Sequence, residues 1–185
     1  PLRDIEAHVH EGGGRTVHDH HSDEKDPHIW LDPGLVKIQA QTIYETLAQI
    51  DPEHRSDYAE NLAGFLADLD EVDREIREKL SDLETRTMMV FHPAWGYFTD
   101  AYGLKQVPIE LGGKEPSAKE MAQLLELAAE EKVKAIFVQS QFSTKAAAAI
   151  AKAVGADVVQ LDPLSSDYLN NLRHIAGTVK VYLSK

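Results

Sequence analysis

The chain has 185 residues, of which 43% are hydrophobic and 27% charged, so it can bury the core of one or two domains. Its net charge of -12, from 31 acidic and 19 basic residues, argues against a nucleic-acid-binding surface and favours cations as partners. The absence of cysteine excludes disulfides and thiolate metal sites, so any metal must bind His, Asp or Glu. No apolar run approaches the roughly 20 residues that span a bilayer. The start at Pro1, without a signal-peptide pattern, is typical of a mature or trimmed product.

The first 27 residues are polar and have neither a helical nor a strand period, which predicts a mobile loop. Histidines alternate there with acidic residues, a composition that suits zinc and other borderline divalent ions. These histidines are His8, His10, His18, His20 and His21. A low-complexity linker or the remnant of a purification tag are the alternatives. Because tags are usually uninterrupted and poor in acids, we favour a loop that gathers metal weakly.

Two Asp-Pro pairs predict the starts of helices, because aspartate caps free N–H groups and proline suits the first helical position. Asp32-Pro33 precedes a helix over residues 34–50, and Asp51-Pro52 precedes a long helix over about 53–83. In the long helix, apolar residues recur every three or four positions, which indicates an amphipathic helix. They are Tyr58, Leu62, Phe65, Leu66, Leu69, Val72, Ile76 and Leu80, and acidic residues such as Glu71, Asp73 and Glu75 are expected on its solvated face.

After Leu83 the pattern changes to short apolar strands that alternate with helices. Strands are expected over residues 87–91, 105–110, 135–140 and 157–161, and helices over 95–103, 117–131, 143–155 and 167–184. Ser117 and Glu120 have the spacing of a capping box. The alternation predicts an α/β fold, in which the long helix is followed by a mostly parallel four-stranded sheet flanked by helices.

Ligands of such sheets bind beyond the carboxyl ends of the strands. His92 follows the first predicted strand and Asp162 follows the fourth, so two metal-binding residue types lie at one edge. His28, in DPHIWLDP, is a third candidate, and Trp30 can pack this segment against the body of the protein. The prolines at 27, 93 and 163 restrict the backbone beside each candidate.

Each candidate also has a structural interpretation. His92 is equally typical of a hydrogen-bonded, partly buried residue, and His28 of a surface loop. Asp162 before a proline is a common turn former and is equally suited to cap the last helix. We expect the remaining histidines and an aromatic group to be structural or solvent-facing: His54 and His174 on helices, and Tyr97, Phe98 and Tyr102 in the core.

Four motifs occur in a characteristic order and separation: DPHIWLDP, FHPAWGYF, IELGGKEPSA and QLDPL. From about His8 to the C-terminus the chain resembles the metal-binding solute-binding proteins of ABC transporters, the cluster A-I group, and most closely its zinc-specific, ZnuA-like branch. In that family, two α/β lobes are joined by a long rigid helix and hold the metal between them. The resemblance implies that residues 1–31 form the His-rich loop and the end of a first lobe. Residues 32–83 then form helices that include the interlobe connector, and residues 84–185 form the second, metal-binding lobe.

The same resemblance implies that His28, His92 and Asp162 are metal ligands. Manganese-binding branches typically have a carboxylate at the position of His92, and an imidazole there favours Zn²⁺ over Mn²⁺. The implied function is high-affinity zinc capture at the periplasmic or extracellular side of a membrane, with delivery to an ABC-type permease. The His-rich loop would raise the local zinc concentration.

The chain departs from the family in one respect. In the family, the first lobe supplies a further histidine, and no such lobe precedes Pro1 in this sequence. The sequence therefore predicts a truncated or proteolysed form, with weaker binding and an uncovered surface able to form a dimer. Two histidines and one carboxylate with an open position are also typical of zinc hydrolases, in which Glu110 or Glu115 would be the base. The chain lacks a nucleophile elbow, a phosphate loop and a His-Glu-x-x-His pair, so we do not expect an enzyme. A cell-surface adhesin of the same family is a further alternative.

Overall fold

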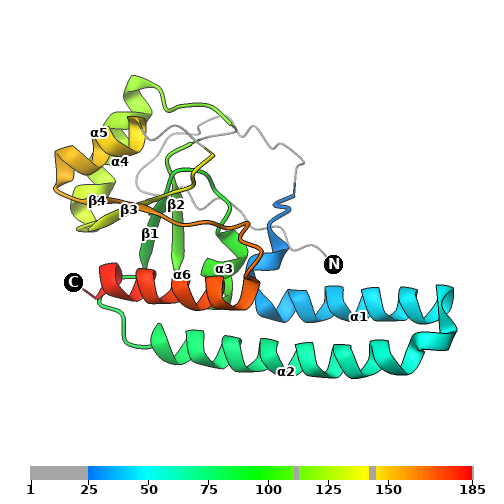
Figure 1. The fold of residues 1–185 in the computed structure, drawn as a ribbon. Helices are drawn as coiled ribbons and strands as arrows, with labels where there is room; N and C mark the ends of the chain where they lie inside the picture. Colours follow the sequence, from blue (N-terminus) through cyan, green and yellow to red (C-terminus); the bar gives the residue numbers. More distant parts are fainter. Residues whose placement is uncertain (1–24, 111–112, 142–144, 185) are drawn as a thin grey trace.

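The computed structural model describes residues 25–110, 113–141 and 145–184. The first element of the described part is a short 3-10 helix, η1, which is followed by a long antiparallel hairpin of two helices (Figure 1). These elements are η1 (Ile29–Leu31), α1 (Pro33–Ile50), the 3-10 turn η2 (Pro52–His54) and α2 (Arg55–Lys79). The five histidines of the predicted metal-gathering loop, His8, His10, His18, His20 and His21, lie outside the described residues.

The two Asp-Pro pairs behave differently. Asp32 caps α1 as predicted, because its Oδ1 accepts a hydrogen bond from the N–H of Gly34 at 2.7 Å. Asp51 makes no side-chain cap, and η2 separates it from α2. Its carboxylate instead accepts a hydrogen bond from the Tyr58 hydroxyl at 2.6 Å and lies 2.9 Å from His54 Nδ1. The carboxylate that was expected to cap the long helix is therefore bound by two side chains. The helix α2 begins two residues later than predicted and ends at Lys79 rather than near Leu83.

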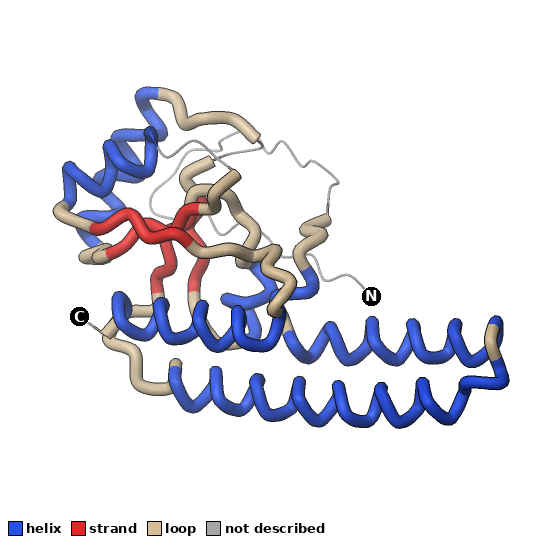
Figure 2. The backbone as a smooth tube through the Cα atoms, in the orientation of Figure 1, coloured by secondary structure: helices blue, strands red, loops and turns tan. Residues whose placement is uncertain are grey.

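The rest of the described chain confirms the α/β prediction. Its four strands, red in Figure 2, are all parallel and lie in the order β2-β1-β3-β4. They are β1 (Thr87–Val90), β2 (Lys105–Pro108), β3 (Ala135–Val138) and β4 (Asp157–Gln160). The helices between and after them are α3 (Gly96–Ala101), α4 (Ala118–Glu130), α5 (Lys145–Val154) and α6 (Tyr168–Leu183). The predicted capping box of Ser117 and Glu120 is present at the start of α4.

Helices cover both faces of the sheet. Neighbouring residues of a strand point to opposite faces, so β1 and β3 each contribute to two core clusters. Val90 and Phe137 lie in a core cluster with residues of α2, α3 and α6, and Met89 and Ile136 lie in a second cluster with residues of α4 and α5. Figure 1 shows α4 and α5 on one side of the sheet and α6 and α2 on the other. The aromatic residues predicted to be core, Tyr97, Phe98 and Tyr102, are buried.

The second half of α2 is part of this lobe, whereas its first half extends beyond the sheet together with α1 (Figure 1). Leu69, Val72 and Ile76 of α2 are fully buried. Glu75 pairs with Arg173 of α6 at 2.6 Å, so charged groups as well as packing tie the long helix to the lobe. Of the acidic residues assigned to a solvated face, Glu71 is exposed, but Glu75 is half-buried in this pair.

The described histidines outside the site are His54 and His174, and both are exposed, as expected. No helix among the described residues is sufficiently long and apolar to cross a membrane.

Candidate metal site

His92 is positioned by the pairing of β1 with β2. The two strands are parallel, with Val90 opposite Pro108, so the residues two positions further on, His92 and Glu110, also lie opposite each other. Their side chains meet, with Nδ1 of His92 3.1 Å from Oε1 of Glu110. Glu110 is 6% exposed, and this contact orients the imidazole so that its Nε2 lies on the side away from Glu110.

The backbone after His92 is a tight turn. The N–H of Ala94 donates to the carbonyl of His92 at 2.8 Å, and the N–H of Trp95 donates to Oε1 of Gln106 at 2.7 Å. Trp95 is buried in the first core cluster. Pro93 and Trp95 of the HPAW sequence therefore belong to a turn that is anchored to the core and to β2.

His28 is held by Asp26, two residues before it. Its backbone N–H donates to Oδ1 of Asp26 at 2.9 Å, and its Nδ1 lies 2.6 Å from the same oxygen. The backbone carbonyl of Asp26 accepts a hydrogen bond from the Tyr97 hydroxyl at 2.9 Å, which joins this segment to α3. As at His92, a carboxylate at Nδ1 directs Nε2 away from itself.

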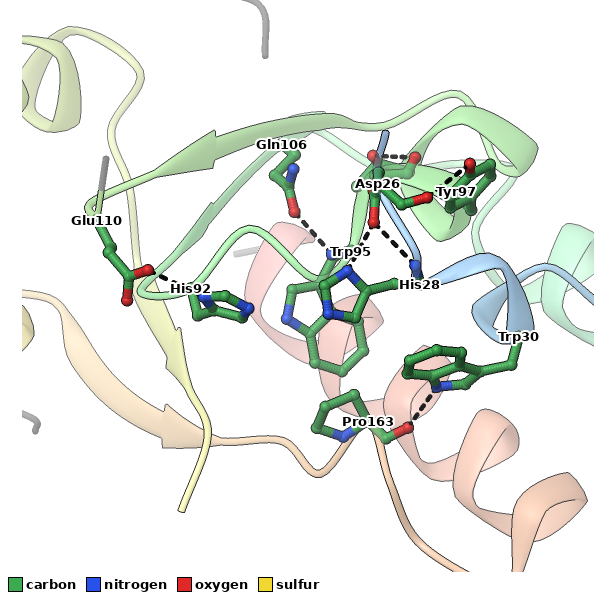
Figure 3. A network of polar contacts seen from close by, with 11 residues as sticks. Asp26, His28, Trp30, His92, Trp95, Tyr97, Gln106, Glu110 and Pro163 are labelled. Carbon is green, nitrogen blue, oxygen red and sulfur yellow. Dashed lines mark hydrogen bonds and ion pairs between the residues drawn. The ribbon is translucent and has the colours of Figure 1, made fainter. Parts of the chain in front are cut away.

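The two imidazoles lie side by side. Their ring centroids are 5.5 Å apart and their planes are inclined by 77°. In Figure 3 the His92 ring extends from the end of β1 toward the His28 ring, and the carboxylates of Glu110 and Asp26 lie on the outer sides of the pair. Two imidazoles bound to one tetrahedral zinc through Zn–N bonds of about 2.0–2.1 Å have centroids about 5 Å apart. The observed separation is therefore close to what a shared zinc ion requires.

Asp162 belongs to a different arrangement. It is exposed, and its Oδ1 accepts a hydrogen bond from the N–H of Leu164 at 2.9 Å, as in the turn-forming interpretation. The next residue, Pro163, accepts a hydrogen bond from Nε1 of Trp30 at 2.9 Å, so this loop contacts the segment that carries His28 (Figure 3). Within residues 25–110, 113–141 and 145–184, no three His, Asp or Glu side chains gather as a metal-binding group. The structure thus brings His28 and His92 together, and the role of Asp162 as a ligand stays a prediction.

Comparison with known proteins identifies the family. A family model described as "Zinc-uptake complex component A periplasmic" matches residues 2–181. The chain belongs to the ZnuA family of zinc-uptake solute-binding proteins. It is 36% identical over 143 residues to the high-affinity zinc uptake system protein ZnuA of Haemophilus influenzae, covering 74% of this chain and 41% of that protein. The resemblance inferred from the four motifs is confirmed.

Two solved structures of ZnuA support the same assignment. A crystal structure of ZnuA superposes with a TM-score of 0.85 and 47% identity over 86% of this chain and 61% of the other. A ZnuA lacking residues 138–173 in its own numbering, with zinc bound, superposes with a TM-score of 0.83 and 46% identity, covering 87% and 62% of the two chains. This chain therefore spans about two fifths of the Haemophilus relative and about three fifths of the solved ZnuA chains. The ZnuA family is one of non-enzymatic metal-binding transport proteins, so membership of it gives the hydrolase alternative no support.

Sequence reasoning missed the roles of Asp26 and Glu110. Glu110 was considered only as a catalytic base, and Asp26 was not considered. Each has a signal in the sequence: Asp26 is two residues before His28, and Glu110 stands the same number of residues beyond β2 as His92 stands beyond β1. The role assigned to Trp30, packing its segment against the body of the protein, is confirmed by its place beside the first core cluster.

Proposed function

We propose that this chain captures zinc at the periplasmic or extracellular side of a membrane and delivers it to an ABC-type permease. The observation that carries the proposal is the pair of imidazoles 5.5 Å apart, each with a carboxylate at Nδ1. Hydrogen bonding from a ligand histidine to a carboxylate fixes the ring and increases its basicity, and is a common feature of zinc sites. Family membership supplies the transport context, and the ion is the cargo of the protein rather than a resident cofactor.

In this proposal His28 and His92 bind zinc through Nε2, and Asp162 supplies an oxygen. Asp162 would give up or share the hydrogen bond from Leu164 to do so. The hydrogen bond from Trp30 to Pro163 holds the QLDPL loop to the segment that carries His28. Two imidazole nitrogens favour zinc, whereas manganese prefers oxygen-rich sites. Selection of Zn²⁺ over Mn²⁺ therefore belongs to the proposal.

The wider organisation is also part of the proposal. Residues 1–31 comprise the metal-gathering loop and the end of a first lobe, residues 32–83 comprise the connector helices, and residues 84–185 form the metal-binding lobe. His8, His10, His18, His20 and His21 would hold zinc weakly and raise its concentration near the site. The dimer and the truncated form expected from the sequence stay predictions, and no residue of the chain argues for the adhesin alternative.

The test is calorimetric titration of the chain with zinc and with manganese, beside a His92→Ala, Asp162→Ala double variant. A second pair of proteins carries alanine at the five loop histidines, which separates loop binding from site binding. We expect the double variant to lose the tightest zinc site and to keep the weak ones. His174→Ala, which removes an exposed imidazole of α6, is the matched control and should titrate like the wild type. Identical titrations of wild type and double variant would show that only the loop binds metal.

A further inference from the structure

A fourth residue, Gln139, occupies the edge of the sheet where the candidate ligands lie. It directly follows β3, the neighbour of β1 on the side opposite β2. Val90 pairs with Phe137, and the N–H of Phe91 donates to the carbonyl of Phe137 at 2.8 Å. Two positions beyond this pair are His92 and Gln139. Gln139 therefore stands beside His92 on one strand as Glu110 does on the other.

Gln139 is also on the face of the sheet that carries the site. Val90 and Phe137 both lie in the core cluster against which Trp30 packs. Since alternate residues of a strand share a face, His92 and Gln139 continue that face at the carboxyl edge. The hydrogen bond from Phe91 to Phe137 continues the pairing of β1 with β3 one residue beyond β1, toward His92 and Gln139.

Gln139 is one of the buried polar residues that the structure describes. It is only 2% exposed, and its Oε1 is buried without a hydrogen-bond partner among the described residues. Buried polar side-chain atoms are nearly always hydrogen-bonded, and an unpaired amide oxygen is unfavourable. A hydrophobic residue of the same size would fill the space without that cost. The oxygen is therefore well suited to accept a hydrogen bond from a group that arrives with a ligand.

A water molecule on a bound divalent cation is such a group. Two imidazoles leave positions of a tetrahedral ion open, and a water in one of them is a strong donor because the cation polarises its O–H bonds. Glu110 is engaged with Nδ1 of His92. An amide oxygen accepts the hydrogen bond without adding a further buried negative charge.

We propose that Gln139 is a positioning residue of the metal site, whose side-chain oxygen accepts a hydrogen bond from water bound to the divalent cation held by His28 and His92. This inference rests on the proposed function. It identifies a residue that acts on the cation through its water and is not itself a ligand. Loss of such an outer contact typically weakens metal binding by about 10-fold or more.

The test uses the 185-residue chain with its five loop histidines replaced by alanine, titrated with Co²⁺, whose visible absorption reports coordination geometry. Gln139→Met removes the oxygen at nearly constant volume, and Gln139→Glu retains an acceptor at the same place. Gln160→Met is the control, because Gln160 is exposed at the end of the adjacent β4. Thermal unfolding without metal is measured for every variant, and His92→Ala reports on the site itself.

We expect Gln139→Met to bind cobalt about 10-fold more weakly with an altered visible spectrum. Its metal-free unfolding temperature should be equal to or higher than that of the wild type, because an unpaired buried acceptor is removed. Gln139→Glu should restore the wild-type spectrum. If Gln139→Met and Gln160→Met both bind like the wild type while His92→Ala loses the site, this inference is wrong and the proposed function stands. If His92→Ala binds cobalt like the wild type, the proposed function is wrong and this inference is wrong with it.

Discussion

His28 and His92 are held by carboxylates that come from different distances along the chain. Asp26 is two residues from His28, so its contact depends only on the local backbone. Glu110 reaches His92 from the next strand, so that contact depends on the register of β1 and β2. The orientation of one imidazole therefore depends on a residue close in sequence, and that of the other depends on the folded sheet.

The carboxylate of Glu110 should be needed for zinc affinity more than for folding. Glu110→Gln keeps the size of the side chain but removes the charge beside His92 Nδ1, and we expect zinc to bind about 10-fold more weakly. Glu115→Gln, a change of the same kind at an exposed position, should leave the affinity unaltered. Competition titration with a zinc chelator measures both. Equal affinities for the two variants would assign Glu110 a role in folding alone.

The turn between α1 and α2 contains a titrating pair. Asp51 raises the pKa of His54 above its ordinary value of 6.5, through a hydrogen bond and its charge, and hydrogen bonds from Tyr58 and His54 lower the pKa of Asp51. A raised histidine pKa means that the folded state binds the proton more tightly than the unfolded chain. The stabilisation is then complete below pH 6.5 and is lost as the pH rises through the raised pKa.

Proton NMR titration of His54 checks this prediction. The measured pKa should exceed 6.5 in the wild type and return toward 6.5 in Asp51→Asn. An unchanged His54 titration in Asp51→Asn would contradict the assignment of the pair.

Among the elements, those with local signals were predicted best. The Asp32 cap, the capping box of Ser117 and Glu120 and the four apolar strands each depend on residues close in sequence, and all are present. The start of α2 was misplaced because the carboxylate of Asp51 accepts a hydrogen bond from Tyr58, seven residues further along the chain, and does not cap the helix. Competition between possible partners of one side chain is not visible in a helical pattern.

Contacts between elements hold the His28 segment against α6. The Tyr168 hydroxyl donates to the carbonyl of Trp30 at 2.7 Å, and burial raises the pKa of Tyr168, so the hydroxyl remains a donor.

Tyr168→Phe should destabilise the fold by about 1 kcal/mol. It should also weaken zinc binding, because η1 carries the residues next to His28. Tyr44→Phe is the control, since the Tyr44 hydroxyl forms no hydrogen bond within the part of the chain that the structure describes. Chemical denaturation measures the stability of both variants, and zinc titration measures their affinity. Equal zinc affinities would mean that the hydrogen bond to η1 does not affect the metal site.

For the whole molecule, the sequence predicted which residues gather at the carboxyl edge but not how they meet. Strand-end positions placed His92 and Asp162 at one edge, and the family resemblance added His28. The 5.5 Å contact between the imidazoles depends on η1 packing beside Trp95 and α6, which no local pattern encodes. Asp162 illustrates the opposite case. Its turn-forming hydrogen bond is local and is present in the structure, whereas a role as ligand requires a cation that competes with the N–H of Leu164 for its carboxylate.

Zinc should stabilise the whole fold, because its proposed ligands join η1 to the end of β1. Free zinc at 100 times its dissociation constant adds about 2.7 kcal/mol to the free energy of unfolding, which corresponds to a rise of about 5–10 °C in Tm for a chain of this size. The loop histidines would bind zinc in the unfolded chain as well, which reduces the effect. The measurement therefore uses the protein with alanine at all five of them.

Calorimetric scans at pH 7.5 and pH 5 complete this prediction. Protons compete with zinc for imidazole nitrogens, so the zinc-dependent rise in Tm should be present at pH 7.5, fall steeply below about pH 6 and disappear on addition of a chelator. His92→Ala should show no rise at either pH, whereas His174→Ala should behave like the wild type. A rise of equal size at both pH values would mean that carboxylates, and not the two facing imidazoles, bind the ion.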